Sequence, residues 1–365
     1  MASSSGIWYW ADHFSSCPVH HQLSLGEGNT PLVRSRHIGP SVGLERLFFK
    51  LEGVNPTGSY KDRFAAAAVS DMAARSATRC IATSSGNTGA ALAAYCATAG
   101  IACEIVVVET APIDKLRQML VYGAKLYRIR GFGIDPRTSR RVLTAIRNLS
   151  DQPKTDLQIS AFAYNPTGMN GVQTIAFEIH RQLPEGIDHV FIPAGGGGLT
   201  LAVARGFETL RKRGGGATPH IECAQPVGND TIATPLRLGL QSARDVTCTS
   251  RISGLQVSRV IDGNETIMAC RATGGTGHVV SDEDVWQMQN RLARQEGIFC
   301  EPAGAVSVTA AIQATSRGEV SASATACCLI TGVGFKDLPS VDRMISYDIP
   351  PLLELGTFSE LSKRT

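Results

Sequence analysis

The stretch Leu51-Glu52-Gly53-Val54-Asn55-Pro56-Thr57-Gly58-Ser59-Tyr60-Lys61-Asp62-Arg63 decides the fold expected for this chain. It begins at the end of an apolar run, 47–51, that is typical of a short strand. Turn chemistry follows at 55–58, and an alanine-rich helix is expected to open near Lys61. The lysine would therefore stand at a strand-to-helix turn on the edge of a parallel sheet. In a dry pocket its pKa would fall, and the free amine could form a Schiff base.

This stretch has two other possible interpretations. A lone lysine in a first helical turn is usually a solvated residue, so a functional role for Lys61 is supported only by the other segments of the chain. Gly53 and Gly58 also have the glycine spacing of a nucleotide-binding P-loop. That motif needs its lysine directly after the second glycine, whereas Ser59 and Tyr60 intervene here. The spacing therefore excludes a P-loop ATPase.

Length and composition favour a compact globular enzyme. The chain has 365 residues, of which 43% are hydrophobic and 18% charged, and a length that suits two lobes. Its formal charge of +3 is spread out, with no basic block, so no nucleic-acid partner is expected. The longest apolar stretches fall short of a membrane span, and the aromatic cluster 8–10 is too short for a signal segment. We expect a cytoplasmic protein with no membrane partner.

The cysteine and histidine patterns predict no metal site. The ten cysteines are scattered, mostly in apolar contexts, as reduced thiols are in cytosolic proteins. There is no CxxC pair, which argues against a zinc ribbon. His13, Cys17, His20 and His21 lie near one another in sequence, but their order and spacing fit no common site.

Most of the chain alternates short β-branched runs with longer helical stretches, which favours an α/β fold with a mostly parallel sheet covered on both faces. Beyond the first strand, strands are expected at 79–83, 103–108, 125–129, 189–192, 219–224 and 326–330. Helices are expected at 87–99, 112–122, 136–149, 171–182, 199–213, 282–295 and 303–314, with a polar break at 150–156.

A glycine run predicts an anion site. Gly195, Gly196, Gly197 and Gly198 follow one expected strand and precede the helix that opens near Leu199. Without Cβ atoms the backbone can turn tightly and point successive N–H groups at one phosphate. The run does not match GxGxxG, and no acidic residue about 20 positions on is placed to hold a ribose, so a dinucleotide is disfavoured. A tight turn without a ligand is the simpler alternative.

Polar residues also follow two other expected strands. Ser84, Ser85, Asn87 and Thr88 stand where a strand meets a helix, where they could bind a carboxylate or phosphate or merely cap the helix. Thr331 directly follows the last strand. Ligands of open α/β sheets bind beyond the carboxyl ends of the strands, so these residues, Lys61 and the glycine run are expected at one rim.

Together these segments resemble the fold-type II pyridoxal-phosphate (PLP) enzymes, and most closely the threonine synthase family. The segments that carry the resemblance are 26–32, 55–63, 85–89, 165–166, 173–178, 296–303 and 331–337, so it spans nearly the whole chain. It implies a tryptophan synthase β-like α/β fold with two lobes, each holding a twisted, mostly parallel sheet flanked by helices. Residues 1–45 and 155–350 would form the larger, cofactor-binding lobe, 46–154 a smaller, mobile lobe that closes on the substrate, and 351–365 a C-terminal tail. It also implies a homodimer.

The resemblance implies roles for individual residues. Lys61 would carry pyridoxal 5'-phosphate and then move protons, Asn87 would bind the ring hydroxyl, and Thr331 would face the pyridine nitrogen. Gly195 to Gly198 would bind the cofactor phosphate, and Ser84, Ser85 and Thr88 the substrate carboxylate. The implied activity is elimination or replacement on a small amino acid with a leaving group at Cβ or Cγ.

Two departures from the family bear on the substrate. Threonine synthases usually carry an arginine, which grips the phosphate of O-phosphohomoserine, where this chain has Gly168, and asparagines in the glycine loop. Losing such a grip removes hydrogen bonds worth ~1.5–3 kcal/mol each, so O-phosphohomoserine is not the expected substrate. Thr167, Asn170 and Arg63 could compensate in part. The alternatives are a cysteate synthase-like β-replacement on O-phosphoserine, serine or threonine dehydration, and, outside catalysis, a non-catalytic PLP-fold interaction protein.

Overall fold

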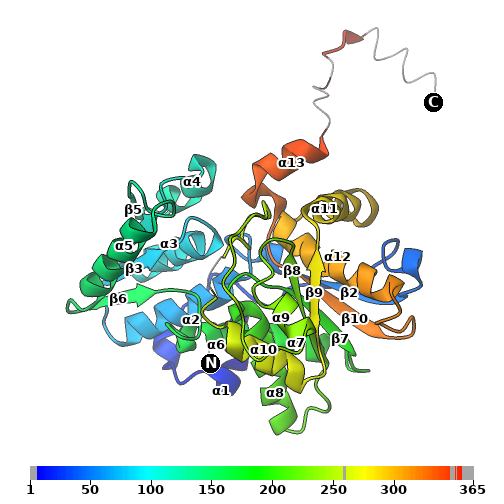
Figure 1. The fold of residues 1–365 in the computed structure, drawn as a ribbon. Helices are drawn as coiled ribbons and strands as arrows, with labels where there is room; N and C mark the ends of the chain where they lie inside the picture. Colours follow the sequence, from blue (N-terminus) through cyan, green and yellow to red (C-terminus); the bar gives the residue numbers. More distant parts are fainter. Residues whose placement is uncertain (1–5, 258–259, 346–349, 351, 356–365) are drawn as a thin grey trace.

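The chain forms two sheets with helices between and around them (Figure 1). The computed structural model describes residues 6–257, 260–345, 350 and 352–355. The strands are β1 Leu32–Arg34, β2 Arg46–Leu51, β3 Arg79–Thr83, β4 Ala102–Val107, β5 Lys125–Arg128, β6 Thr155–Gln158, β7 His189–Pro193, β8 His220–Pro226, β9 Gly277–Val280 and β10 Thr325–Ile330.

The helices are mostly those that the sequence predicts. They are α1 Ala11–Phe14, α2 Lys61–Ala74, α3 Asn87–Ala99, α4 Ile113–Val121, α5 Pro136–Ser150, α6 Pro166–Val172, α7 Thr174–Gln182, α8 Gly198–Lys212, α9 Ala233–Arg237, α10 Gly263–Ala272, α11 Asp282–Glu296, α12 Pro302–Ser316 and α13 Leu338–Met344. Short 3-10 turns cover Gly6–Trp10, Val19–His21, Pro40–Val42, Glu52–Val54 and Gly334–Lys336. Among the helices described, none combines the length and hydropathy that crossing a membrane requires.

Both sheets are almost entirely parallel, as expected. The larger has the order β1-β2-β10-β7-β8-β9 and the smaller the order β5-β4-β3-β6. The pairing of β1 with β2 is antiparallel, and the other pairings are parallel. Because helices cover both faces, the central strands read as continuous apolar runs, and β10 is buried at every residue. Apart from β1, the carboxyl ends of the strands in each sheet therefore lie along one rim.

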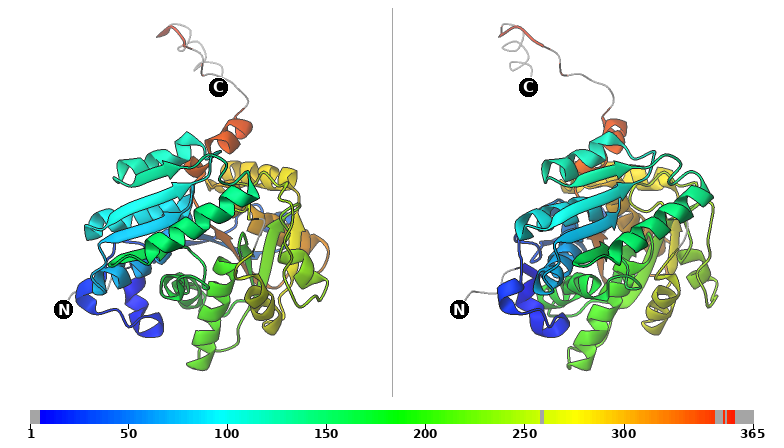
Figure 2. Two further views of the ribbon diagram at one scale, coloured as in Figure 1. Left: turned by 60° about the vertical axis from the view of Figure 1, so that its left-hand side comes forward. Right: turned by 90° about the vertical axis from the view of Figure 1, so that its left-hand side faces the viewer.

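Side-chain alternation assigns the two faces of the smaller sheet to different helices. Ile81 and Val106 point to one face, where they pack with Ile146 of α5, and Figure 2 shows α5 lying across that sheet. Cys80 and Ile105 point to the other face and join the main core, which includes α2 and α3. α2 is almost completely buried, and its alanines let neighbouring helices approach closely.

Some elements differ from expectation. The helix expected over 171–182 is two helices, α6 and α7, which meet at Gln173. β6 occupies the end of the expected polar break and pairs with β3, which supplies the hydrogen bonds that its polar composition does not suggest. β1, β9, α9, α10 and α13 are short elements that the periodicity does not predict.

Sheet membership also differs from the expected lobe boundaries at two strands. β2 begins at Arg46, the start of the expected smaller lobe, but pairs with β10 in the larger sheet. β6 begins at Thr155, the start of the expected larger segment, but pairs with β3 in the smaller sheet. The chain therefore passes from the larger sheet to the smaller sheet after β2 and returns to the larger sheet after β6. The expected C-terminal tail, 351–365, lies outside the described residues except for 352–355.

Candidate active site

Lys61 is the first residue of α2, at the rim of the larger sheet. The turn before it is hydrogen-bonded to the segment after β10: Tyr60 N donates to Thr331 O at 3.0 Å, and Val333 N donates to Gly58 O at 3.0 Å. Gly58 has φ +92°, a conformation that favours glycine. Since β2 and β10 are parallel neighbours, their ends adjoin, and this fixes the position of the lysine against Thr331.

The amine of Lys61 reaches hydroxyls at the rim of the smaller sheet. Its Nζ donates to Ser160 Oγ at 2.7 Å, and Ser160 Oγ lies 3.1 Å from Thr88 Oγ1. Ser160 follows β6, and Thr88 lies in the first turn of α3. Nζ also lies 4.6 Å from the centre of the Tyr60 ring. The two sheets therefore meet at this amine, and Ser160 is a contact that sequence reasoning missed because β6 was assigned to a polar break.

A buried carboxylate joins two of the expected cofactor contacts. Glu301 Oε2 accepts from Asn87 Nδ2 at 3.0 Å, and its Oε1 accepts from Thr331 Oγ1 at 2.9 Å. Burial raises the pKa of Glu301, and these two hydrogen bonds oppose that rise. Asn87 and Thr331, 244 positions apart in the numbering, are thus brought together across the sheets. The sequence places Glu301 in a motif but gives it no role.

The glycine run lies between β7 and α8 and has the shape of an anion cradle. Gly197 has φ +93°, and a Cβ there would lie 2.5 Å from Thr266 Oγ1. A Cβ on Gly198 would lie 3.0 Å from Asp262 Oδ2, whereas one on Gly196 would meet nothing closer than 3.9 Å. Glycine is therefore required at 197, a Cβ at 198 would make a tight contact with Asp262, and at 196 glycine leaves open space through which a ligand can approach the backbone.

The first turn of α8 adds to this cradle. Its free N–H groups and its dipole attract an anion at the helix start. The Thr200 hydroxyl in that turn is buried and has no hydrogen-bond partner within the described structure. The glycine backbone, the helix start and this hydroxyl suit a phosphate group.

The loop between β3 and α3 faces the same rim. Ser84 and Ser85 are half-buried there, and Ser84 Oγ accepts from Gly86 N at 3.2 Å. Asn87 and Thr88 continue into α3 and make the contacts described above. The residues expected to bind a carboxylate are thus neighbours of Lys61 through Thr88 and Ser160.

Thr167 and Asn170 lie on α6, which packs against α2. A Cβ on Gly168 between them would lie 2.6 Å from the Phe64 ring. Asn170 Oδ1 accepts from Gln173 Nε2 at 2.7 Å. Within the described residues, the structure brings neither Thr167 nor Asn170 into the hydrogen-bonded group around Lys61.

The suggestion that Arg63 compensates for a missing substrate contact is wrong. Its side chain is completely buried and is held by carboxylates: Nε donates to Glu52 Oε2 at 2.7 Å and Nη1 to Glu178 Oε1 at 2.6 Å. Lys50 Nζ contacts the second oxygen of Glu178 at 2.7 Å. The Arg63 guanidinium is therefore part of an internal ion network, and its donors are directed away from any substrate.

Two lysines that sequence reasoning did not single out lie beside the Lys61 turn. Lys336 Nζ donates to Gln118 Oε1 at 2.6 Å, and Gln118 Nε2 donates to Thr57 O at 3.0 Å. Burial lowers the pKa of Lys336. Lys115, one turn before Gln118 on α4, lies 3.5 Å from Asp337 Oδ2. These contacts join α4, next to the smaller sheet, to the segment after β10.

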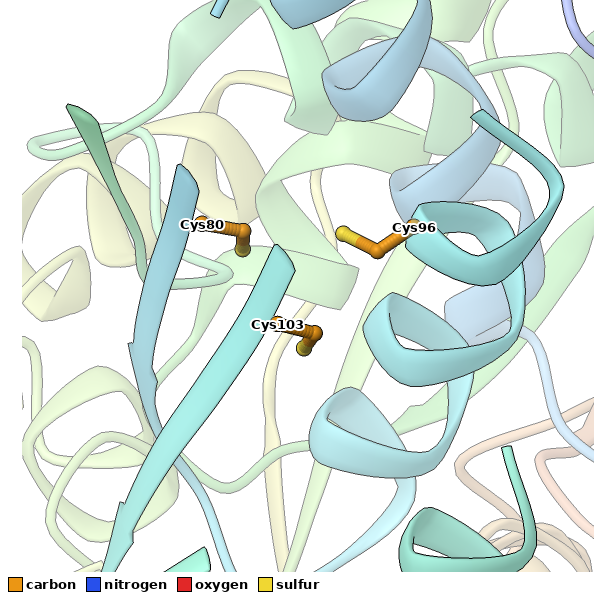
Figure 3. Close-up of side chains that lie close together, drawn as sticks. All are labelled: Cys80, Cys96 and Cys103. Atoms are coloured by element: carbon orange, nitrogen blue, oxygen red, sulfur yellow. The ribbon is translucent and has the colours of Figure 1, made fainter. Parts of the chain in front are cut away.

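Three of the cysteines form a cluster between the smaller sheet and α3. Cys80, Cys96 and Cys103 come from β3, α3 and β4, and Figure 3 shows their side chains converging between the sheet and the helix. Their sulfur atoms lie within 4.8 Å of one another, and all three residues are buried. All ten cysteines are free, as expected for reduced thiols.

Comparison with known proteins decides the family. A family model described as "Pyridoxal-phosphate dependent enzyme" matches residues 23–332. This chain belongs to that family. The threonine synthase of Synechocystis sp. is 33% identical over 339 residues, covering 88% of this chain and 81% of the relative. The threonine synthase of Methanosarcina acetivorans is 31% identical over 340 residues, covering 92% and 81%.

Solved structures agree on the fold. The threonine deaminase isoform 2 of Solanum lycopersicum aligns with a TM-score of 0.73 at 20% identity, covering 95% of this chain and 96% of that one. Maize serine racemase aligns with a TM-score of 0.68 at 22% identity, covering 92% of each. The chain is thus a fold-type II PLP enzyme close to threonine synthase, and it acts by elimination or replacement on a small amino acid.

Proposed function

We propose that this enzyme binds PLP through Lys61 and catalyses a threonine synthase-like reaction in which a leaving group departs from Cβ or Cγ of a small amino acid. The observation that carries the proposal is the 2.7 Å contact of Lys61 Nζ with Ser160, at the rim shared with Asn87, Thr331 and the glycine loop. PLP, when bound, supplies the electron sink that acidifies the Cα–H bond of the substrate.

Residues at this rim would make the contacts with the cofactor. The N–H groups of Gly195 to Gly198 and the start of α8 would hold the cofactor phosphate. Asn87 would donate to the ring hydroxyl, and Thr331 would offer a neutral hydroxyl to the ring nitrogen. Thr331 donates its proton to Glu301 Oε1 at 2.9 Å, and to serve an unprotonated nitrogen that proton would turn to the ring. Burial raises the pKa of Glu301, which favours a neutral carboxyl that would then donate to Thr331 Oγ1. A hydroxyl, in place of a carboxylate, leaves the nitrogen largely unprotonated and tunes the strength of the electron sink.

The remaining residues act on the substrate. Lys61 would take the proton from Cα, with Ser160 holding the amine in place. Ser84, Ser85 and Thr88, with the free N–H groups that begin α3, would hold the substrate carboxylate. Thr88 contacts Ser160, so carboxylate binding and amine position would be coupled through one hydroxyl.

A second candidate, β-chemistry, is favoured by position 168. A side chain there would meet the Phe64 ring, so a phosphate-gripping arginine does not fit without displacing α2. Arg63 is held in its internal network. Both points weaken the case for O-phosphohomoserine and support dehydration of serine or threonine, or replacement on O-phosphoserine. Thr167 and Asn170 stay as proposed substrate contacts that only a ligand complex can test.

A substrate screen on purified, PLP-loaded enzyme tests the proposal. O-phosphohomoserine, O-phosphoserine, serine and threonine are each followed for keto acid, phosphate and new amino acids together. Threonine and phosphate from O-phosphohomoserine would identify a threonine synthase, whereas keto acid from serine or threonine would identify a dehydratase. Lys61→Ala is the control and should abolish turnover and the visible absorbance of the lysine-linked cofactor. A stable absorbance band with no turnover on any substrate would instead support a non-catalytic PLP-binding protein.

We also propose that the enzyme is a cytoplasmic homodimer whose smaller lobe, built around β3 to β6, closes on the substrate. The α4 contacts with the segment after β10 support closure, because they cross between the two sheets next to Lys61. Light scattering on the eluting protein tests the dimer, and fractionation of cells tests the location. Hydrogen exchange with and without substrate tests closure, which should protect α4.

A further inference from the structure

A second polar cluster lies at the opposite ends of β7 and β8 from the active site. His189 is the first residue of β7, His220 is the first residue of β8, and the two are paired in register. Glu222 is two residues further along β8, so its side chain points to the same face as that of His220. β7 spans the five residues from His189 to Pro193, a length of roughly 13 Å, and the glycine loop begins two residues beyond its far end. The cluster is a separate site.

The three side chains converge on one point. One ligand atom from each of His189, His220 and Glu222 lies within 4.8 Å of the others. His189 Nδ1 is 2.9 Å from Glu222 Oε1, and the centres of the two imidazole rings are 4.9 Å apart. Glu222 is buried, His189 is half-buried and His220 is exposed, so the point is open to solvent on one side.

The surrounding groups orient these side chains as ligands. His220 Nδ1 lies 3.1 Å from Gly274 O, so it carries the proton and donates it, which leaves Nε2 with its lone pair. Glu222 Oε2 accepts from Thr276 N at 2.8 Å and from His278 Nε2 at 3.0 Å. Metal-binding histidines and carboxylates are commonly fixed by such contacts.

The donor atoms of the cluster also suit a cation. Glu222 Oε1 contacts His189 alone among the hydrogen bonds of the described residues, whereas Oε2 accepts from two groups. Two imidazoles and one carboxylate form a ligand set that binds Zn²⁺ with a fourth position left for water.

We propose that His189, His220 and Glu222 form a binding site for one Zn²⁺ ion. The ion would take the place of the proton shared by His189 Nδ1 and Glu222 Oε1, and His220 Nε2 would be the third ligand. Nitrogen ligands favour Zn²⁺ over Mg²⁺ or Ca²⁺, which prefer oxygen. Because the site links the first residues of two neighbouring strands on the far side of the sheet, the ion would stabilise β7 against β8 and take no part in the reaction.

Calorimetric titration of tag-free, PLP-loaded enzyme with Zn²⁺ tests the proposal. Wild type should bind one ion per chain, and His220→Ala should bind it at least ~100-fold more weakly, since even an outer contact is worth 10–100-fold. The control removes the other histidine pair, His20 and His21, whose rings lie 4.1 Å apart. The double variant His20→Ala, His21→Ala should bind Zn²⁺ as wild type does.

Thermal unfolding gives a second readout that does not depend on activity. Zn²⁺ should raise the Tm of wild type and of the His20, His21 double variant, but not that of His220→Ala. His220 is exposed, so its replacement should leave the fold and the metal-free activity unchanged. The proposal is overturned if wild type binds no stoichiometric Zn²⁺, or if His220→Ala binds it as tightly as wild type.

Discussion

The Nζ atom of Lys61 lies 2.7 Å from the Oγ atom of Ser160, although 99 residues separate them. Lys61 begins a helix at the rim of the larger sheet, and Ser160 follows the last strand of the smaller one. The contact therefore depends on how the two sheets are placed relative to each other. It makes Ser160 a positioning residue for the amine.

Replacing Ser160 with alanine should lower the rate without loss of fold. A hydrogen bond of this kind is worth ~0.5–1.5 kcal/mol, which corresponds to about 2–10-fold if it persists in the reacting state. kcat should fall more than KM rises, and the dependence of kcat on pH should shift. Ser150→Ala, at the half-buried last residue of α5, is the control. An unchanged kcat with an unchanged pH profile would remove Ser160 from the site.

Removing the buried guanidinium of Arg63 should cost far more stability than removing an exposed one. Arg63→Met leaves the carboxylates of Glu52 and Glu178 without their main partner, which costs about 3–5 kcal/mol. Arg75 is about half exposed and pairs with Asp71 and Asp156 at the surface, so Arg75→Met should cost at most ~1 kcal/mol. Urea unfolding of the two variants measures both. Similar small losses would contradict the structure.

The stability of the folded protein should fall as pH rises, because of Asp62. Burial raises its folded pKa to about 7, against an ordinary value of 3.8, while hydrogen bonds from Thr57 oppose the rise. The folded form keeps the proton longer than the unfolded form, so the contribution is complete below pH 4 and is lost as pH rises to 7. The loss is up to about 4 kcal/mol.

Asp62→Asn isolates this effect from other groups. The variant cannot ionise at 62, so wild type minus variant gives the contribution of that carboxyl alone. Urea unfolding at several pH values should show that the free energy of unfolding of the variant rises relative to that of wild type between pH 4 and 7. A difference that is constant with pH would mean that Asp62 titrates normally.

Gly168 should be intolerant of a side chain although it lies in a helix. Alanine there would gain about 1 kcal/mol of helix propensity, but its Cβ would meet the Phe64 ring, and such overpacking costs ~1–3 kcal/mol. Gly168→Ala should therefore destabilise the wild type and destabilise a Phe64→Leu background less. Denaturant unfolding of the four proteins of this cycle measures the coupling. Additive effects would show that the helices do not meet at this point.

Thiol reactivity should follow burial. Cys17 and Cys248 are half-buried and the other eight cysteines are buried, so two thiols per chain should react with Ellman's reagent in the native enzyme. Burial raises the pKa of both, so they should react more slowly than a free thiol. In denaturant the remaining eight thiols should become exposed and react as well. Rapid native reaction of Cys80, Cys96 or Cys103 would mean that α3 opens readily from the sheet.

Local sequence patterns predicted most of the central elements but few of the short ones. β3 and α3 begin and end where their periodicity predicts, because each is long enough to show its pattern. β6 has only four residues of mixed polarity and is a strand because β3 lies beside it. Gln173 divides an apolar helical pattern into two helices, α6 and α7, which periodicity cannot detect.

The sequence by itself determined the α/β class, the strand-to-helix turn at Lys61 and the glycine run after β7, because these depend on hydrophobic periodicity and on backbone chemistry within a few residues. Only the tertiary structure decided that Lys61 contacts Ser160, that Glu301 joins Asn87 to Thr331, and that Arg63 is buried between two carboxylates. These contacts join residues far apart in the chain, and a hydrogen bond depends on where the folded sheets place the two atoms. The spacing of residues along the chain does not carry that information.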